Sequence, residues 1–211
     1  MSKPRTFPLL PLLLGGFLAV FLWSAIGPMD CFTWFLEVLP AILGLFLLIL
    51  TFHRFRFTGL AYGLMFLHAV ILMVGGHYTY AEMPLFERLQ EAFGWDRNYY
   101  DRLGHFAQGF VPAVVAREIL VRTSPLRPGK WLFTLVFAVC LSISALYELF
   151  EWAMALWTGE AAEAFLGTQG DVWDTQWDMF LCLCGAIVSL LALSRLHDRQ
   201  LAALSVGRAG S

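Results

Sequence analysis

Residues 34–52 read WFLEVLPAILGLFLLILTF, a continuous apolar run whose only charged side chain is Glu37. An α-helix needs about 20 mostly apolar residues to cross the hydrocarbon core of a bilayer. The chain holds further stretches of this kind, so the sequence predicts six membrane-spanning helices, at about residues 8–26, 34–52, 58–76, 99–121, 131–157 and 173–196. The predicted fold class is all-α, with residues 1–211 forming one polytopic transmembrane bundle.

The composition of the whole chain supports this prediction. Of its 211 residues, 59% are hydrophobic and 14% are charged, and the mean hydropathy is +0.67. A soluble domain carries about a quarter charged residues, and one core could not hide this much apolar surface. The net charge of −2 offers no basic surplus for nucleic acid. The four cysteines form no CxxC pair, which excludes a zinc ribbon and a disulfide scaffold.

Basic residues in the short connecting loops predict the orientation, because cytoplasmic loops are enriched in lysine and arginine. With the N-terminus inside, only Arg88, Arg97 and Arg102 lie on the outer side. The other eleven are cytoplasmic: Lys3, Arg5, Arg54, Arg56, Arg117, Arg122, Arg127, Lys130, Arg195, Arg199 and Arg208. Both termini are therefore predicted to be cytoplasmic. The first apolar run is longer than a usual signal-peptide core, so we predict a true span there.

Acidic residues gather on the predicted outer side, where all but Glu118 and Asp198 fall. Several lie within the predicted spans at helical spacing, so that three polar residues share one face of each helix. These faces carry Asp101, His105 and Gln108 on the fourth span, Ser144, Glu148 and Glu151 on the fifth, and Asp171, Asp174 and Asp178 on the sixth. Consecutive antiparallel spans are neighbours, so we expect the three faces to converge below the His77 end of the third span. Glu37 either joins these three faces or, together with Pro40, only marks a kink in the second span.

Such convergence needs a compensating charge, because an unpaired ion inside a bilayer is costly. Arg102 and His105 are the nearest cationic candidates, too few for six carboxylates. The sequence therefore predicts a bound cation, shared protons or water access. The candidate ligands of one divalent metal ion are Asp101, His105, Glu148, Glu151, Asp174 and Asp178. Carboxylates suit hard cations, and a histidine extends the choice to manganese, zinc or iron.

A plainer alternative is that the aspartates near helix N-termini are caps that face headgroup water. Asp101, Asp171 and Asp174 fit that alternative. Glu148 and Glu151 do not, because the C-terminal half of a helix disfavours negative charge.

Two other features carry separate expectations. Residues 83–93, MPLFERLQEAF, place Phe86, Leu89 and Phe93 on one face. This pattern predicts a short helix that lies at the outer interface or packs on the bundle. His68 lies in the middle of the third span, where we expect a hydrogen-bonded interior histidine rather than a ligand.

Four separated segments resemble the YjdF-like family of bacterial inner-membrane proteins. They are GGHYTYAEMPLF (75–86), YDRLGHFAQGF (100–110), SALYELFEW (144–152) and GDVWDTQWDMFLCLCGA (170–186). The resemblance covers most of the chain and implies a multi-pass protein surrounded by the inner-membrane bilayer, without implying an activity. A fainter similarity to VanZ-like membrane proteins rests on Asp101 with His105, Glu148, and Asp174 with Asp178, although Glu151 stands where that family has glutamine.

Three kinds of function fit these residues. The first is a membrane enzyme acting on a lipid-linked or envelope substrate, with His105 as general base or metal ligand and Glu148 among the carboxylates that hold a water-activating metal. The second is a cation or proton-coupled transporter, whose polar residues should continue through the inner half, where only Arg117 and Glu118 stand out. The third is an assembly protein whose polar faces bind neighbouring helices.

Overall fold

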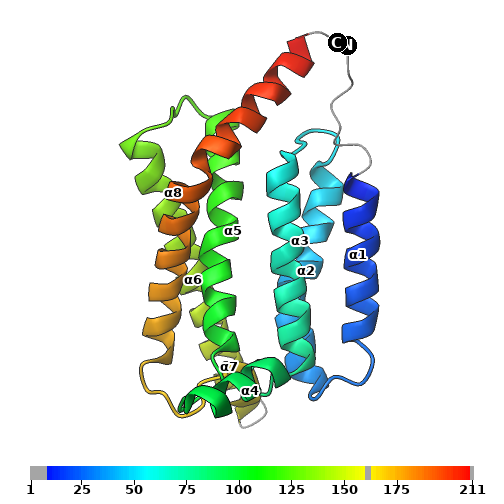
Figure 1. Cartoon of the computed structure of the whole chain (residues 1–211), viewed down its shortest axis with the longest axis vertical. Helices are drawn as coiled ribbons and strands as arrows, with labels where there is room; N and C mark the ends of the chain where they lie inside the picture. The colour runs from blue at the N-terminus through cyan, green and yellow to red at the C-terminus, as the bar shows by residue number, and fades with distance from the viewer. Residues whose placement is uncertain (1–8, 160–162, 210–211) are drawn as a thin grey trace.

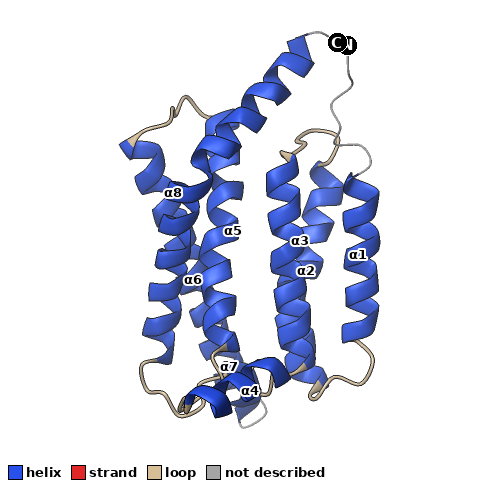
Figure 2. Ribbon diagram, in the orientation of Figure 1, coloured by secondary structure: helices blue, strands red, loops and turns tan. Residues whose placement is uncertain are grey.

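A computed structural model describes residues 9–159 and 163–209, so Lys3, Arg5 and Glu160 lie outside the described residues. Within these ranges the chain contains helices and connecting loops and no strand, which confirms the all-α class (Figure 2). The helices are α1 (Leu9–Ser24), α2 (Cys31–Thr51), α3 (Gly59–His77), α4 (Pro84–Phe93), α5 (Tyr100–Thr123), α6 (Lys130–Thr158), α7 (Glu163–Leu166) and α8 (Asp174–Ala209) (Figure 1).

Each of the six predicted spans coincides with one long helix. Among the described residues, four helices are long and apolar enough to cross a membrane: α2, α3, α6 and residues Asp174–Leu204 of α8. Helix α1 is apolar but shorter, and α5 is long but more polar. These helices support a membrane protein, while the full count of six spans and the orientation stay predictions. Helix α8 continues well beyond residue 196, where the sequence placed its end.

Local signals explain where the first spans begin. Helix α2 starts three residues before the predicted boundary because the carboxylate of Asp30 accepts a hydrogen bond from the backbone N–H of Thr33, at 2.6 Å. Thr58 caps α3 in the same way, its hydroxyl accepting from the N–H of Ala61 at 3.2 Å. Both are ordinary N-caps, which satisfy backbone donors that the first helical turn leaves free.

The long helices form two groups of three. One group is α1, α2 and α3, the other is α5, α6 and α8, and α3 packs against α5 to join them (Figure 1). Helix α1, which has no charged residue, lies at the edge and packs mainly on α3. The short helix α4 lies across one end of the bundle, where Phe86 packs edge-on against Tyr100 at a ring separation of 5.3 Å.

Helices α5 and α8 make the most extensive contact in the bundle. A glycine allows it: a Cβ at Gly185 would overlap the backbone oxygen of Phe106 and lie 2.9 Å from the nitrogen of Phe110. Small residues of this kind let two spanning helices approach until their backbones touch. The polar faces predicted on the two helices are therefore held close together.

Candidate functional site

The polar faces of α5, α6 and α8 meet at the α4 end of the bundle. We call the assembled group the acidic cluster. Its members are Glu37, Arg97, Asp101, Arg102, His105, Glu148, Glu151, Asp171, Asp174 and Asp178. All of them except Asp171 are buried. Each helix contributes through residues three or four positions apart, which share one face of an α-helix.

His105 occupies the centre of this cluster. Its Nε2 atom lies 3.3 Å from an oxygen of Asp101 and 3.7 Å from an oxygen of Asp178. One ligand atom from each of these three residues lies within 4.8 Å of the others. On the other side of the ring, Nδ1 lies 3.2 Å from the Gln108 side-chain oxygen and 3.9 Å from an oxygen of Glu148. The imidazole therefore has carboxylates from all three helices around it.

Two arginines pair with the aspartates of α8. Arg97 donates to Asp174 at 2.7 Å and to the carbonyl oxygen of Gly167 at 3.0 Å. Arg102 contacts Asp174 at 2.8 Å, Asp171 at 3.0 Å and Asp178 at 2.5 Å. The sequence named Arg102 and His105 as the nearest cationic candidates, and the structure adds Arg97 to them. Arg97 precedes α5 and was assigned to the outer loop, although its spacing to Asp101 is four residues.

The cluster keeps an excess of acid even with both arginines counted. Seven carboxyl groups stand against two guanidinium groups and one imidazole. Two buried carboxylate oxygens, Oδ2 of Asp101 and Oε1 of Glu148, have no hydrogen-bond partner among the described residues. Oδ2 of Asp101 still lies 3.6 Å from Arg97 and 3.7 Å from Arg102, and Oε1 of Glu148 lies 3.9 Å from Nδ1 of His105. Because acid remains in excess and buried polar atoms are nearly always satisfied, protons or a cation are expected in the cluster.

The remaining candidate residues occupy distinct places. Asp174 forms ion pairs with both Arg97 and Arg102. Glu151 is buried one turn along α6 from Glu148. Asp101 makes no cap hydrogen bond at the start of α5, so the capping alternative does not describe it. Asp171 fits that alternative better, since one of its oxygens accepts from the N–H of Trp173 at 2.9 Å.

Glu37 of α2 joins the cluster, which the sequence left open. The Tyr147 hydroxyl donates to its carboxylate at 3.3 Å. Tyr80 closes the same side: its ring fills the space that glycine leaves at Gly75 and Gly104, where a Cβ at residue 104 would lie 2.9 Å from the ring. Burial raises the pKa of the Tyr80 phenol well above its ordinary value, so the phenol is neutral at physiological pH.

His77 does not cover the cluster, contrary to expectation. Its Nδ1 atom lies 2.9 Å from the carbonyl oxygen of Ser24, and its ring packs on Trp23 at 4.6 Å. The end of α3 is thus fastened to α1, and the segment after it carries Tyr80 back toward the cluster. The sequence placed the His77 end of the third span over the acidic cluster. The segment after His77 does reach the cluster, but it does so through Tyr80.

A cavity of about 490 Å³ borders the cluster at the start of α8. Its lining comes from Thr168, Gly170, Asp171, Val172, Asp174, Thr175 and Gln176. Asp171 and Asp174 thus belong both to this cavity and to the ion pairs with the arginines. Asp171 and Asp174 are the members of the acidic cluster that this cavity exposes.

A second polar group, the Glu118 cluster, lies at the opposite end. It consists of Thr58, Arg117, Glu118, Arg122, His197 and Asp198. The carboxylate of Glu118 is fully buried and contacts the Thr58 hydroxyl at 2.8 Å and Nε2 of His197 at 3.0 Å. His197 lies just beyond residue 196, where the sequence placed the end of the last span, and so was not predicted in this group. Both Glu118 oxygens have partners, as in a structural ion pair.

The space between the two clusters is mainly apolar, although the buried hydroxyls of Ser144 and Ser189 lie on the same helices. Its core consists of Ala113, Leu132, Val136, Cys140, Cys182, Ala186 and Leu190, all buried. No described titratable group other than the two cysteine thiols interrupts this core. The arrangement separates the two polar ends of α5 and α8.

The comparisons with known proteins agree with this architecture. The family described as "Predicted membrane protein (DUF2238)" matches residues 9–199. The chain is also 53% identical over 182 residues to the "Inner membrane protein YjdF" of Escherichia coli (strain K12), covering 86% of this chain and 87% of that protein. No solved structure matches. The chain therefore belongs to the DUF2238 family of membrane proteins and is a multi-pass protein of the bacterial inner membrane.

Proposed function

We propose that the protein is a metal-dependent enzyme whose acidic cluster binds one divalent cation at the outer face of the inner membrane. The observation that carries the proposal is the set of ligand atoms from Asp101, His105 and Asp178, all within 4.8 Å of one another. The buried Oε1 of Glu148 supports it, because this carboxylate oxygen lies 3.9 Å from Nδ1 of His105 and has no hydrogen-bond partner among the described residues. A mixed oxygen and imidazole set suits manganese, zinc or iron.

The surroundings of His105 suit a metal ligand. In the tautomer whose Nδ1 proton points to the Gln108 oxygen, Nε2 presents its lone pair toward Asp101 and Asp178. Metal-bound histidines commonly hold the second ring nitrogen in such a hydrogen bond, which fixes the tautomer. Asp178 accepts from Arg102 and still has lone pairs for a ligand bond, since a carboxylate offers about four acceptor positions.

The chemistry that such a site supports is attack by an activated water on a polar substrate group. A divalent cation lowers the pKa of bound water and stabilises developing negative charge. Glu148 faces His105 from α6 and is the candidate general base for that water. The cavity lined by Asp171 and Asp174 gives access from the loop end, as a lipid-linked or envelope substrate would need.

The proposal includes the topology of six spans with both termini in the cytoplasm. The start of α1 and the end of α8 lie at the same end of the bundle, as an even number of crossings requires (Figure 1). The Glu118 cluster, with Arg117 and Arg122, lies at the basic end, which the positive-inside rule assigns to the cytoplasm. The acidic cluster then faces outward.

Transport and assembly are the competing functions. A cation carrier needs a polar path, and the apolar core between the two clusters argues against one. An assembly role is favoured by one specific observation: Arg97 and Arg102, at the start of α5, form ion pairs with Asp171 in the loop before α8 and with Asp174 and Asp178 of α8. That role needs the arginines but no metal, so metal content separates it from the enzyme.

The test is metal analysis of the full chain purified in detergent, followed by thermal unfolding with chelator and with added manganese, zinc or iron. We expect about one tightly bound ion per chain and a rise in melting temperature, because binding to the native state adds stability. His105→Ala should lose both. His77→Ala is the matched control, since its partner is Ser24 rather than the cluster. A wild-type chain with no metal and no melting shift on addition would overturn the proposal.

A further inference from the structure

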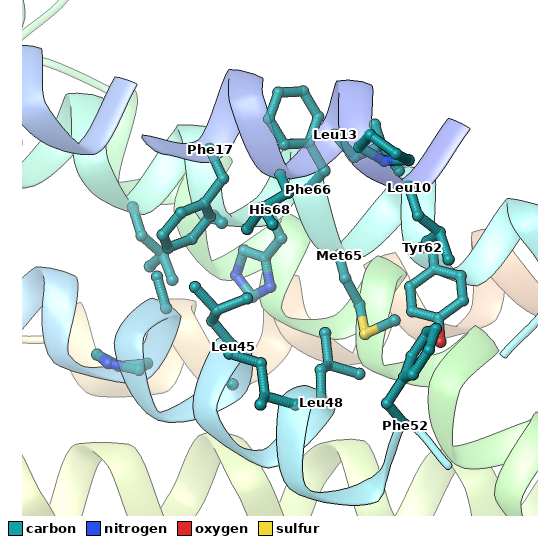
Figure 3. A pocket seen from close by; sticks show the side chains of 18 of the residues that line it. Leu10, Leu13, Phe17, Leu45, Leu48, Phe52, Tyr62, Met65, Phe66 and His68 are labelled. Carbon is teal, nitrogen blue, oxygen red and sulfur yellow. The ribbon is translucent and has the colours of Figure 1, made fainter. Parts of the chain in front are cut away.

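An apolar pocket of about 610 Å³ lies between α1, α2 and α3, within the three-helix group that does not contain His105 (Figure 3). Its walls include Leu13 and Phe17 from α1, Leu45 and Leu48 from α2, and Met65 and Phe66 from α3. The volume is in the range of small-molecule sites, about 300–1,000 Å³. Nothing in the proposed enzyme function uses this pocket.

His68 is half-buried and lies in the middle of this pocket, whose other polar side chains are His53 and Tyr62. Figure 3 shows its imidazole surrounded by the apolar side chains of all three helices. Among the described residues it has no hydrogen-bond partner, so the expectation of a hydrogen-bonded interior histidine was wrong. A polar group removed from water without a partner costs free energy. Water is a poor substitute here, because it needs two to four polar neighbours.

The depth of His68 restricts what can be its partner. It lies nine residues from each end of α3, or about 13 Å at 1.5 Å per residue. The hydrocarbon core is about 30 Å thick, so His68 lies near its midplane. Phospholipids and fatty acids keep their polar groups at the interface, far from this depth. A quinone does not: its two carbonyl oxygens sit on an uncharged ring that stays in hydrocarbon.

We propose that this pocket binds the ring of a lipid-soluble quinone, with a ring nitrogen of His68 donating a hydrogen bond to one quinone carbonyl. Phe17, Tyr62 and Phe66 supply aromatic faces and edges for a flat ring. Leu14 and Ile49 line the pocket and are also exposed, at 46% and 61%, so an isoprenoid tail can leave between α1 and α2 into the lipid. The proposal concerns binding and involves no electron transfer.

The experiment uses the full chain in nanodiscs of defined phospholipid, titrated with a short-tailed ubiquinone analogue. Histidine ¹⁵N labelling reports on only five residues, so the ring signal of His68 can be followed directly. We expect a saturable shift of that signal alone. His68→Phe should weaken binding about tenfold, the equivalent of one hydrogen bond, and His68→Asn should recover part of it. Because His68→Phe removes an unsatisfied group, the unliganded variant should stay folded.

A pair of glycines provides the steric control. Gly44 lines the pocket and has no atom within 4 Å of a Cβ position, so Gly44→Leu should extend its side chain into the pocket and abolish binding. Gly63 has equal space but is not among the lining residues, so Gly63→Leu should bind like wild type. Unchanged affinity in both His68→Phe and Gly44→Leu would overturn the proposal. So would a pocket held by a phospholipid chain that the analogue cannot displace.

Discussion

Gly109 of α5 rests directly on the backbone of Cys182 of α8, so that a Cβ at residue 109 would overlap the Cys182 carbonyl oxygen. The Cys140 thiol also points at this place, 3.7 Å from the carbonyl oxygen of Gly109. The contact lies one turn from His105 along α5. The spacing of the two helices that build the acidic cluster is therefore set by the absence of a side chain at two positions, Gly109 on α5 and Gly185 on α8.

Gly109→Ala should destabilise the protein, because the atom in the way is backbone and can move only with its helix. Overpacking of this kind costs about 1–3 kcal/mol. Thermal unfolding in detergent measures the loss. Gly63→Ala is the matched control, since nothing lies within 4 Å of a Cβ there. Equal melting temperatures for the two variants would show that α5 and α8 are farther apart than described.

Glu148→Gln separates a bound metal from shared protons. If the cluster holds a cation, the amide removes a negative ligand from beside His105, and both metal content and melting temperature should fall. If the carboxyl groups share protons, the amide mimics a protonated acid and the change should be neutral or stabilising. Metal analysis and thermal unfolding of the same preparation give the answer. Glu87→Gln, on the exposed side of α4, controls for the loss of a charge.

Arg102→Gln should be strongly destabilising even in a chain that binds no metal. The guanidinium contacts Asp171, Asp174 and Asp178, and removing one partner of a buried ion pair costs about 3–5 kcal/mol. Lowering the pH should restore part of the stability, because protonation discharges the carboxylates left behind. Arg88→Gln, at an exposed position of α4, should unfold like wild type at every pH. A flat pH response of Arg102→Gln would contradict this account.

The native cysteines allow a test of the orientation in the full chain. Cys31 is exposed at the start of α2, and Cys140 and Cys182 are buried. A membrane-impermeant maleimide should therefore label Cys31 in intact cells with a permeabilised outer membrane, and Cys31→Ser should remove that label. In the Cys31→Ser background, Arg127→Cys should react only after the inner membrane is opened. Labelling of residue 127 from outside would reverse the proposed topology.

The sequence predicted the helices and the central site residues because both follow from regular spacing. Asp101, His105 and Asp178 lie on helix faces that helical periodicity brings to one side. Arg97 was missed because it precedes the helix, where no periodic pattern places it. The sequence placed the His77 end of the third span over the cluster, whereas Tyr80 is the side chain that reaches it. The chain turns between these two residues, with positive φ at Thr79 and Tyr80. Such a turn redirects side chains in a way that spacing along a helix does not describe.

The sequence also could not predict that His68 lacks a hydrogen-bond partner, for a different reason. Whether an interior histidine is satisfied depends on what the neighbouring helices offer at the same depth. Here α1 and α2 present Phe17, Leu45 and Leu48, none of which can hydrogen-bond through its side chain. Which residues face His68 depends on the rotation and tilt of α1 and α2. Packing between the helices determines both, and the spacing of residues along one sequence does not reveal it.

The ion pairs between α5 and α8 also constrain how a ribosome can deliver this chain to the membrane. Arg97 and Arg102 leave the ribosome well before their partners at residues 171–178, and synthesis at about 5–20 residues per second makes the interval several seconds. Through that time α5 has charges that the lipid tails disfavour. We expect α5 to wait at the translocon or the interface until α8 emerges, so that the synthesis of α8 decides whether α5 enters the bilayer.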